Sequence, residues 1–326
     1  MEEKPNTNPK ANEPSPTESQ CPSYTAILKE HDIAEGQRQS RRGLLRKIGS
    51  KEFNNGKVCG VVSHITKEGV MGSGLESLDI PILGNILRQI GDVDVLVLIL
   101  HSPGGDGTCV EKFVALCRNQ CKHFRVVIPN MAKSAATMIA LGADQIIMGP
   151  PSELGPIDAQ VPVVIAGMPK YISAQSFIDA RDTLLEKYKE MKAKKEDARP
   201  ILQMIASLDI AHIEECQRMM DFGRDVVRKL LTKHMFHRER KRAVHIDRVV
   251  KMLSSVKTHM VHGRQIDGAT ARRKLGLNIR LLAKDDKLWQ LIWEYYTRAD
   301  VALGNLRSPK MFETEHETLS CQVENR

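Results

Sequence analysis

Two loop segments of this sequence contain residues that could catalyse an acyl transfer. "LHSPGGDG" covers residues 100–107 and "PNMAKSA" covers residues 129–135. The first contains Gly104 and Gly105, whose backbone can approach a substrate closely because no side chain intervenes. The second places the hydroxyl of Ser134 at the start of an expected helix, where free N–H groups and the helix dipole favour negative charge. Together the two segments predict a serine nucleophile beside an oxyanion hole.

Each segment also has a simpler structural interpretation. A serine at a helix start is most often an N-cap, whose hydroxyl accepts a backbone hydrogen bond, and SPGG is most often a turn. One segment alone would therefore indicate little about catalysis. Their occurrence in one chain, separated by one helix and one strand, favours the catalytic interpretation.

Alternating strands and helices are expected to position these loops. Apolar runs predict strands at 57–66, 93–100, 124–130 and 145–150, and apolar residues at helical spacing predict helices at 107–120 and 133–143. This alternation is typical of parallel strands joined by right-handed crossovers, and therefore of an α/β layered fold. In an open parallel sheet, ligands bind beyond the carboxyl ends of the strands, where both loops begin.

The second half of the chain is expected to be mostly helical. Helices are predicted at 173–198, 209–235 and 285–303, and the segment 267–279 is expected to form a short capped helix that ends at Gly276, before another strand. The chain is divided into a disordered tail (1–22), a helical or linker lead-in (23–56), a catalytic domain (57–283), an aromatic helix (284–304) and a loose tail (305–326).

The aromatic helix is expected to mediate self-association. It places Leu288, Leu291, Ile292 and Tyr295 at helical spacing, with Trp289, Trp293 and Tyr296 on an adjoining stripe. Such a wide apolar face favours a contact between subunits, because tryptophan and tyrosine contribute much of the energy at interfaces. The alternative is that the helix covers the core of its own domain.

Composition excludes several classes of protein. No apolar run is long enough to cross a bilayer, and the first twenty residues lack the apolar core of a signal peptide, so a cytoplasmic protein is expected. Seven cysteines without a CxxC pair predict neither a metal site nor a cofactor. The net charge is +8, but the basic run at 234–248 lacks interleaved aromatics and is interpreted as a solvated helix face, which excludes nucleic acid and leaves contact with a membrane surface open.

Three motifs in order resemble those of the Clp protease and crotonase superfamily. They are "SPGG", a serine that opens a small-residue helix about thirty residues later, and "ADQIIMGPPSELGPIDAQ" at 143–160. Within the superfamily the chain is most similar to the SDH-family Clp-fold serine proteinases and to signal peptide peptidase A, which has an element like "HGRQIDGATARRKLGLNI" at 262–279. The resemblance spans roughly residues 57–280. It implies a Clp/crotonase-like layered fold of repeated β-β-α units with a helical C-terminal region.

The resemblance also implies roles for particular residues. Ser134 falls on the nucleophile, and the N–H groups of Gly105 and Ala135 fall on the oxyanion hole, with Gly104 and Gly105 also binding substrate. At the position of the Clp histidine this chain has Asp158, and no histidine occurs between Ser134 and His212, so a relay of the Clp type is not expected. Asp158 is instead interpreted as an auxiliary group or a turn residue.

Peptidase A uses a lysine some forty to fifty residues after its serine. Lys187 is the leading candidate here because its spacing fits and it follows two leucines, and Lys194 and Lys195 are alternatives. A lysine acts as a base only in a desolvated site that lowers its pKa. Lys133 adjoins Ser134, but its side chain is expected to project away toward the surface.

The sequence therefore predicts a serine peptidase that uses a serine/lysine dyad and a backbone oxyanion hole. Its expected substrates are peptides or unfolded proteins, its expected assembly is a homo-oligomer, and no cofactor is implied. Two alternatives stay open. One is an inactive scaffold of the same fold that binds peptides or partners, and the other is acyl-thioester chemistry through Asp158.

Overall fold

A seven-stranded sheet forms the centre of the computed structural model, which describes residues 27, 34–52, 59–255 and 264–321. The strands follow the order β10 (Ile279–Leu281), β5 (Gln145–Met148), β3 (Cys121–Ile128), β2 (Val93–His101), β1 (Cys59–Thr66), β11 (Lys310–Thr314) and β12 (Thr318–Cys321). The first five run parallel, and β11 and β12 are joined antiparallel at one edge. The predicted α/β layered fold with parallel strands is confirmed.

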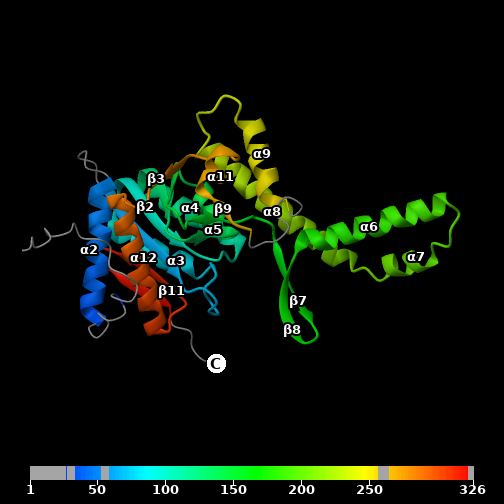
Figure 1. Cartoon of the computed structure of the whole chain (residues 1–326), viewed down its shortest axis with the longest axis horizontal. Helices are drawn as coiled ribbons and strands as arrows, with labels where there is room; N and C mark the ends of the chain where they lie inside the picture. Colours follow the sequence, from blue (N-terminus) through cyan, green and yellow to red (C-terminus); the bar gives the residue numbers. More distant parts are fainter. Residues whose placement is uncertain (1–26, 28–33, 53–58, 256–263, 322–326) are drawn as a thin grey trace, which may run out of the picture.

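Both faces of the central sheet are buried, which explains the continuous apolar run of β2. Leu96, Leu98 and Leu100 belong to one core cluster, and the alternating residues Val95, Val97 and Ile99 belong to a second one. The first cluster contains residues of α3 (Asp79–Ile90), α4 (Val110–Asn119) and α5 (Ala135–Leu141). The second contains residues of α2 (Ala34–Glu52) and α12 (Lys287–Leu306), which lie together on the opposite face (Figure 1).

A small sheet lies beyond the carboxyl ends of the central strands. It consists of β4 (Met131–Ala132), β6 (Glu153–Leu154) and β9 (Ile266–Asp267), with β4 parallel to β6. The 3-10 turn η1 (Gly107–Cys109) precedes α4, and α11 (Gly268–Arg273) follows β9. The small sheet places the segment before α5 beside the segment that follows β5.

A long arm projects from one side of the molecule (Figure 1). It contains the hairpin of β7 (Gln160–Ile165) and β8 (Met168–Ser173), then α6 (Ala174–Ala193) and α7 (Arg199–Ala206), while α8 (Ile210–Lys233) and α9 (Arg242–Ser254) lead back to the sheet. The helix predicted at 173–198 ends at Ala193, and Pro200 lies in the first turn of α7. The hairpin was not predicted.

The prediction of a loose tail at 305–326 is wrong for the part that the structure describes. All five residues of β11 are buried, and β11 pairs with β1 in the central sheet. Its charged residues made the segment look exposed in the sequence. Lys310 and Glu313 are buried nevertheless because each has a charged partner inside the fold, Asp79 and Arg41 respectively.

The aromatic helix α12 covers the chain's own core. Leu288, Trp289, Ile292 and Tyr295 are at most 5% exposed. Leu291, Trp293 and Tyr296 are partly buried against the same cluster. The face predicted to contact another subunit therefore packs on β-strands and α2 of one chain, because those elements also present an apolar surface.

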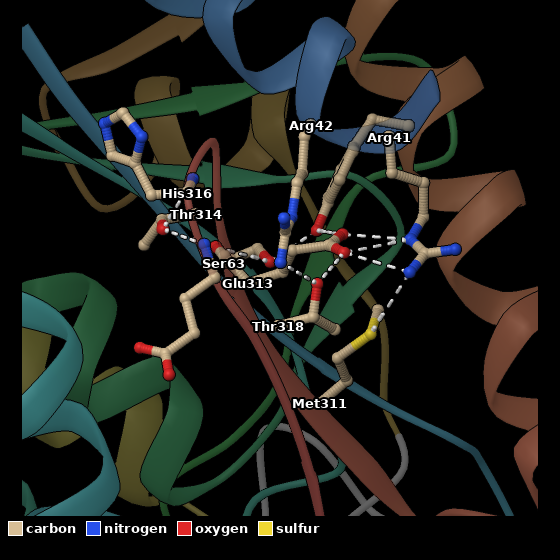
Figure 2. A network of polar contacts seen from close by, with 10 residues as sticks. Arg41, Arg42, Ser63, Met311, Glu313, Thr314, His316 and Thr318 are labelled. Atoms are coloured by element: carbon tan, nitrogen blue, oxygen red, sulfur yellow. Dashed lines mark hydrogen bonds and ion pairs between the residues drawn. The ribbon is translucent and has the colours of Figure 1, made fainter. Parts of the chain in front are cut away.

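A buried polar network joins the two ends of the described chain (Figure 2). The Arg41 guanidinium on α2 donates to both carboxylate oxygens of Glu313 at 2.9 Å. The hydroxyls of Tyr295 and Thr318 donate to the same carboxylate at 3.0 and 2.6 Å. Burial, followed by the charge of Glu313, raises the pKa of Tyr295 well above its usual value. The network fixes α2 and α12 to the antiparallel edge of the sheet.

Within the described ranges, no helix combines the length and the apolar character that a bilayer span requires. The predicted tail at 1–22 and most of the segment before Ala34 lie outside the described residues, as do His262 and Gly263 of the second peptidase-like motif.

Candidate active site

Ser134 occupies a strained position at the start of α5. Its backbone dihedrals are φ 46° and ψ −117°, a positive φ that is uncommon for any residue with a side chain. Although Ser134 precedes the helix, its side chain makes no capping hydrogen bond. The simpler interpretation of this serine as an N-cap is therefore wrong, and the hydroxyl is not used to stabilise the helix.

Two glycines make the close approach to Ser134 sterically feasible. Gly104 has φ 105°, and a Cβ atom at this position would lie 2.8 Å from Cβ of Ser134 and from the carbonyl oxygen of Lys133. Gly105 has φ 140°, and its Cβ would lie 2.3 Å from the backbone of Leu75. A side chain at either position would displace one wall of the site.

Backbone hydrogen bonds hold the two loops side by side. The N–H of Ser102 donates to the carbonyl of Met131 at 3.1 Å, and the N–H of Lys133 donates to the carbonyl of Ser102 at 3.1 Å. In the part of the chain that the structure describes, the N–H groups of Gly105 and Ala135 have no acceptor. These are the two donors predicted for the oxyanion hole, and both are available to an external oxygen.

His101 is a residue of this region that the sequence interpretation missed. It ends β2 directly before the SPGG loop, and its Nδ1 accepts a hydrogen bond of 3.3 Å from the N–H of Met131. Its ring packs on Tyr296 with centroids 4.8 Å apart. Burial lowers the pKa of His101 to about 4, so the ring is neutral near pH 7 and joins the two loops as a structural group. The position of this histidine directly before "SPGG" is the sequence signal that could have identified it.

Lys133 lies inside the fold, contrary to the predicted surface position. Its side chain is 12% exposed and forms an ion pair with Glu153 of β6. It passes over Gly155, where a Cβ would lie 2.6 Å from its Cδ. The lysine is buried because β4 and β6 pair in the small sheet and bring its carboxylate partner alongside.

A family model of the ClpP-like SDH-type serine proteinases matches residues 26–235 of the sequence. The chain belongs to this family. The match includes both loops of the site and ends in the region of α8, so α9, α12 and the antiparallel edge strands lie outside it.

Other proteins match this chain over shorter stretches or at low identity. Two uncharacterized proteins of Methanocaldococcus jannaschii, MJ0137 and MJ1495, are 39% and 38% identical over 64 residues. This match covers 20% of the chain and 22% of either relative, so the chain spans about a fifth of the length of these relatives.

Solved structures give distant matches. Two variants of the 1510-N membrane-bound stomatin-specific protease are 15% identical with a TM-score of 0.29, covering 44% of this chain and 67% of theirs in one case and 73% and 98% in the other. An enoyl-CoA hydratase from Mycobacterium avium subsp. paratuberculosis is 14% identical with a TM-score of 0.25, covering 54% of this chain and 90% of the hydratase.

The three lysines predicted as the base all lie on or just after α6, in the projecting arm. Lys187 is exposed on the helix, Lys194 is exposed at its C-terminal end, and Lys195 follows with a positive φ of 58°. None of the three has, within one chain, the desolvated surroundings that a lysine base requires.

Asp158 is buried close to the segment that pairs with β4. It is 3% exposed, and Nε2 of Gln160 donates to its Oδ2 at 3.1 Å. The neighbouring N–H of Ile157 donates to the carbonyl of Leu253, which ties this segment to the end of α9. Its auxiliary role stays a prediction.

The described residues contain no cluster of three or more histidine, cysteine or carboxylate side chains that could hold a metal ion.

Proposed function

We propose that this member of the serine proteinase family hydrolyses peptide bonds with Ser134 as its nucleophile. The observation that carries the proposal is the conformation of Ser134. A positive φ at a residue with a side chain, a glycine packed against it and a hydroxyl that caps nothing together describe a side chain held out for chemistry. Its place at the strand-to-helix turn resembles the sharp turns that expose nucleophilic serines elsewhere.

In the proposed reaction, Oγ of Ser134 attacks the peptide carbonyl and its proton passes to a neutral amine. The carbonyl oxygen becomes an oxyanion, and the N–H groups of Gly105 and Ala135 donate to it. Collapse of this intermediate breaks the C–N bond, and the protonated amine returns the proton to the leaving nitrogen. Water then attacks the acyl-enzyme by the same route and releases the free serine.

The base in this proposal is a lysine of α6, with Lys187 first and Lys194 and Lys195 as alternatives. Because all three are exposed in one chain, the dyad requires a surface that covers the arm, either the bound substrate or a second copy of the chain. A homo-oligomer and a peptide or unfolded-protein substrate therefore belong to the same proposal. The proposal also includes a cytoplasmic location, which subcellular fractionation tests.

Covalent labelling and substitution test the nucleophile. A fluorophosphonate probe should label the wild-type protein on the peptide that contains Ser134, and Ser134→Ala should lose both labelling and hydrolysis of fluorescent casein while its melting temperature changes little. Ser207→Ala, at the exposed C-terminal end of α7, serves as the control and should keep both activities. Casein hydrolysis that survives in Ser134→Ala would exclude this nucleophile. A folded wild type that is never labelled would favour the inactive scaffold or thioester chemistry through Asp158.

A further inference from the structure

A buried ion pair is connected to the proposed oxyanion hole through the backbone around Leu75. Lys310 of β11 is 4% exposed and Asp79, the first residue of α3, is fully buried. The Lys310 ammonium lies 2.9 Å from Oδ1 of Asp79 and donates to Oδ2 at 3.0 Å. The two residues are far apart in sequence, and Figure 1 shows their elements on the same side of the molecule. Burying two charges is costly, and loss of either member alone would leave an unpaired charge in the interior.

Both members of the pair also hold the backbone on either side of Leu75. The Lys310 ammonium donates to the carbonyl of Gly74 at 2.8 Å. Oδ2 of Asp79 accepts the N–H of Glu76 at 2.9 Å. The residue between them is therefore clamped by one charged group from β11 and one from α3, and each hydrogen bond is strengthened by the charge.

Leu75 in turn holds both peptide groups that flank Gly105. Its N–H donates to the carbonyl of Gly104 at 2.6 Å, and its carbonyl accepts the N–H of Asp106 at 2.8 Å. The peptide between Gly104 and Gly105 is trans, so its N–H points opposite to its carbonyl. Because Leu75 fixes the carbonyl on one side, the N–H of Gly105 must point to the other side, away from Leu75.

We propose that Lys310 and Asp79 are positioning residues that set the direction of the Gly105 N–H through Leu75. The inference rests on the proposed function, in which this N–H receives the oxyanion. It assigns a role to the C-terminal edge of the sheet, since Lys310 lies outside the segment that matches the proteinase family. Neither residue touches the substrate, and their effect on the reaction passes through two backbone hydrogen bonds.

Replacing Asp79 and Lys310 together distinguishes a positioning role from a general loss of stability. Asp79→Asn/Lys310→Met removes both charges, so that neither is left buried alone. Asp79→Leu/Lys310→Met, with two apolar side chains of similar volume, is the second variant if the first does not fold. Lys67→Met is the matched control, because the Lys67 pair with Asp300 is partly exposed, at 30% and 19%, and Lys67 contacts the backbone just before β11. Circular dichroism verifies that each variant is folded at the assay temperature.

Kinetics on a peptide ester give the first readout. Loss of one oxyanion donor typically lowers kcat by about 100-fold to 1000-fold, so misdirecting the Gly105 N–H should lower kcat by at least about 10-fold with KM nearly unchanged. Lys67→Met should retain wild-type kcat. A folded variant without the pair that keeps wild-type kcat would overturn the proposal, as would an equal loss in the control.

Hydrogen exchange gives a second readout that does not depend on catalysis. The amides of Leu75 and Asp106 should exchange at least about 10-fold faster without the ion pair, and they should be unchanged in Lys67→Met. Failure of wild-type protein to react with the fluorophosphonate probe would reject the proposed function alone. Exchange would then decide the structural link: faster exchange at these two amides supports it, and unchanged exchange overturns it.

Discussion

At the scale of single residues, the conformation of Ser134 distinguishes two interpretations that its sequence context leaves equal. The sequence predicted a serine at a helix start, and a capping serine would have an extended backbone with its oxygen bound to a backbone N–H. Ser134 has a positive φ and no such bond. Residue type and spacing can nominate a nucleophile, but a backbone dihedral depends on the packing of Gly104 against it.

We expect buried His64, next to the Lys310–Asp79 ion pair, to make the folded protein less stable in acid. Burial lowers the pKa of His64 to about 4, and both its ring nitrogens lack a hydrogen-bond partner among the described residues. Between pH 6.5 and 4 the unfolded chain therefore binds a proton that the folded chain does not. The free energy of unfolding should fall as pH falls through this window, by at most about 1.4 kcal/mol per pH unit from this residue.

Urea denaturation at several pH values measures this dependence. His64→Leu should flatten the slope between pH 6.5 and 4, whereas His316→Gln, on the exposed turn between β11 and β12, should leave it unchanged. His101, whose pKa burial also lowers to about 4, should account for part of the remaining slope. An unaltered slope in His64→Leu would contradict the assignment.

At the scale of elements, the sequence predicted the parallel strands and their helices well because the strands are continuous apolar runs and the helices between them place apolar residues at helical spacing. It missed α3, which contains Pro81 and Gly84, and it missed the β7–β8 hairpin, whose apolar side chains are partly exposed. It also missed β11, where Lys310 and Glu313 interrupt the apolar pattern. Buried charges depend on partners far along the chain, and these cannot be identified from local sequence.

The arm helix α6 provides the test of the proposed base. Activity should rise toward alkaline pH as a lysine loses its proton, without the inflection near 6.5 that an unperturbed histidine would give. Lys187→Ala should lower kcat by at least about 100-fold, and Lys189→Ala, another exposed lysine of the same helix, should be nearly neutral. Full activity in Lys187→Ala combined with loss in Lys194→Ala or Lys195→Ala would move the role to the later residue.

At the scale of the whole molecule, the Arg41 network joins the N-terminal helix to the C-terminal strands. Arg41→Met leaves the buried Glu313 carboxylate without its cation, and the free energy of unfolding should fall by about 3 kcal/mol. Arg46→Met is the matched control, because the Arg46 pair with Glu315 is largely exposed, and the loss there should stay below about 0.5 kcal/mol. Urea denaturation compares the two, and similar losses would contradict the proposed difference between buried and exposed pairs.

Self-association stays a prediction, but we now expect the contact between subunits on the arm, because α12 packs on the core of its own chain. The hairpin exposes Val164, Met168 and Tyr171 by 75%, 64% and 73%. Sedimentation velocity at micromolar concentration should show species larger than the 36.6 kDa chain. Val164→Ser/Tyr171→Ser should shift the distribution toward monomer, and Val244→Ser, equally exposed on α9, should not. A wild type that sediments as a monomer throughout would refute the prediction.

The sheet order also determines when the site can be completed during translation. Lys310 follows Asp79 by 231 residues in the sequence, so the ribosome releases Ser134 and both loops of the site well before β11 can emerge and pair with β1. A nascent chain would thus carry the nucleophile without the clamp on Leu75. Under the proposed function, we therefore expect the full rate of hydrolysis only after β11 has paired with β1.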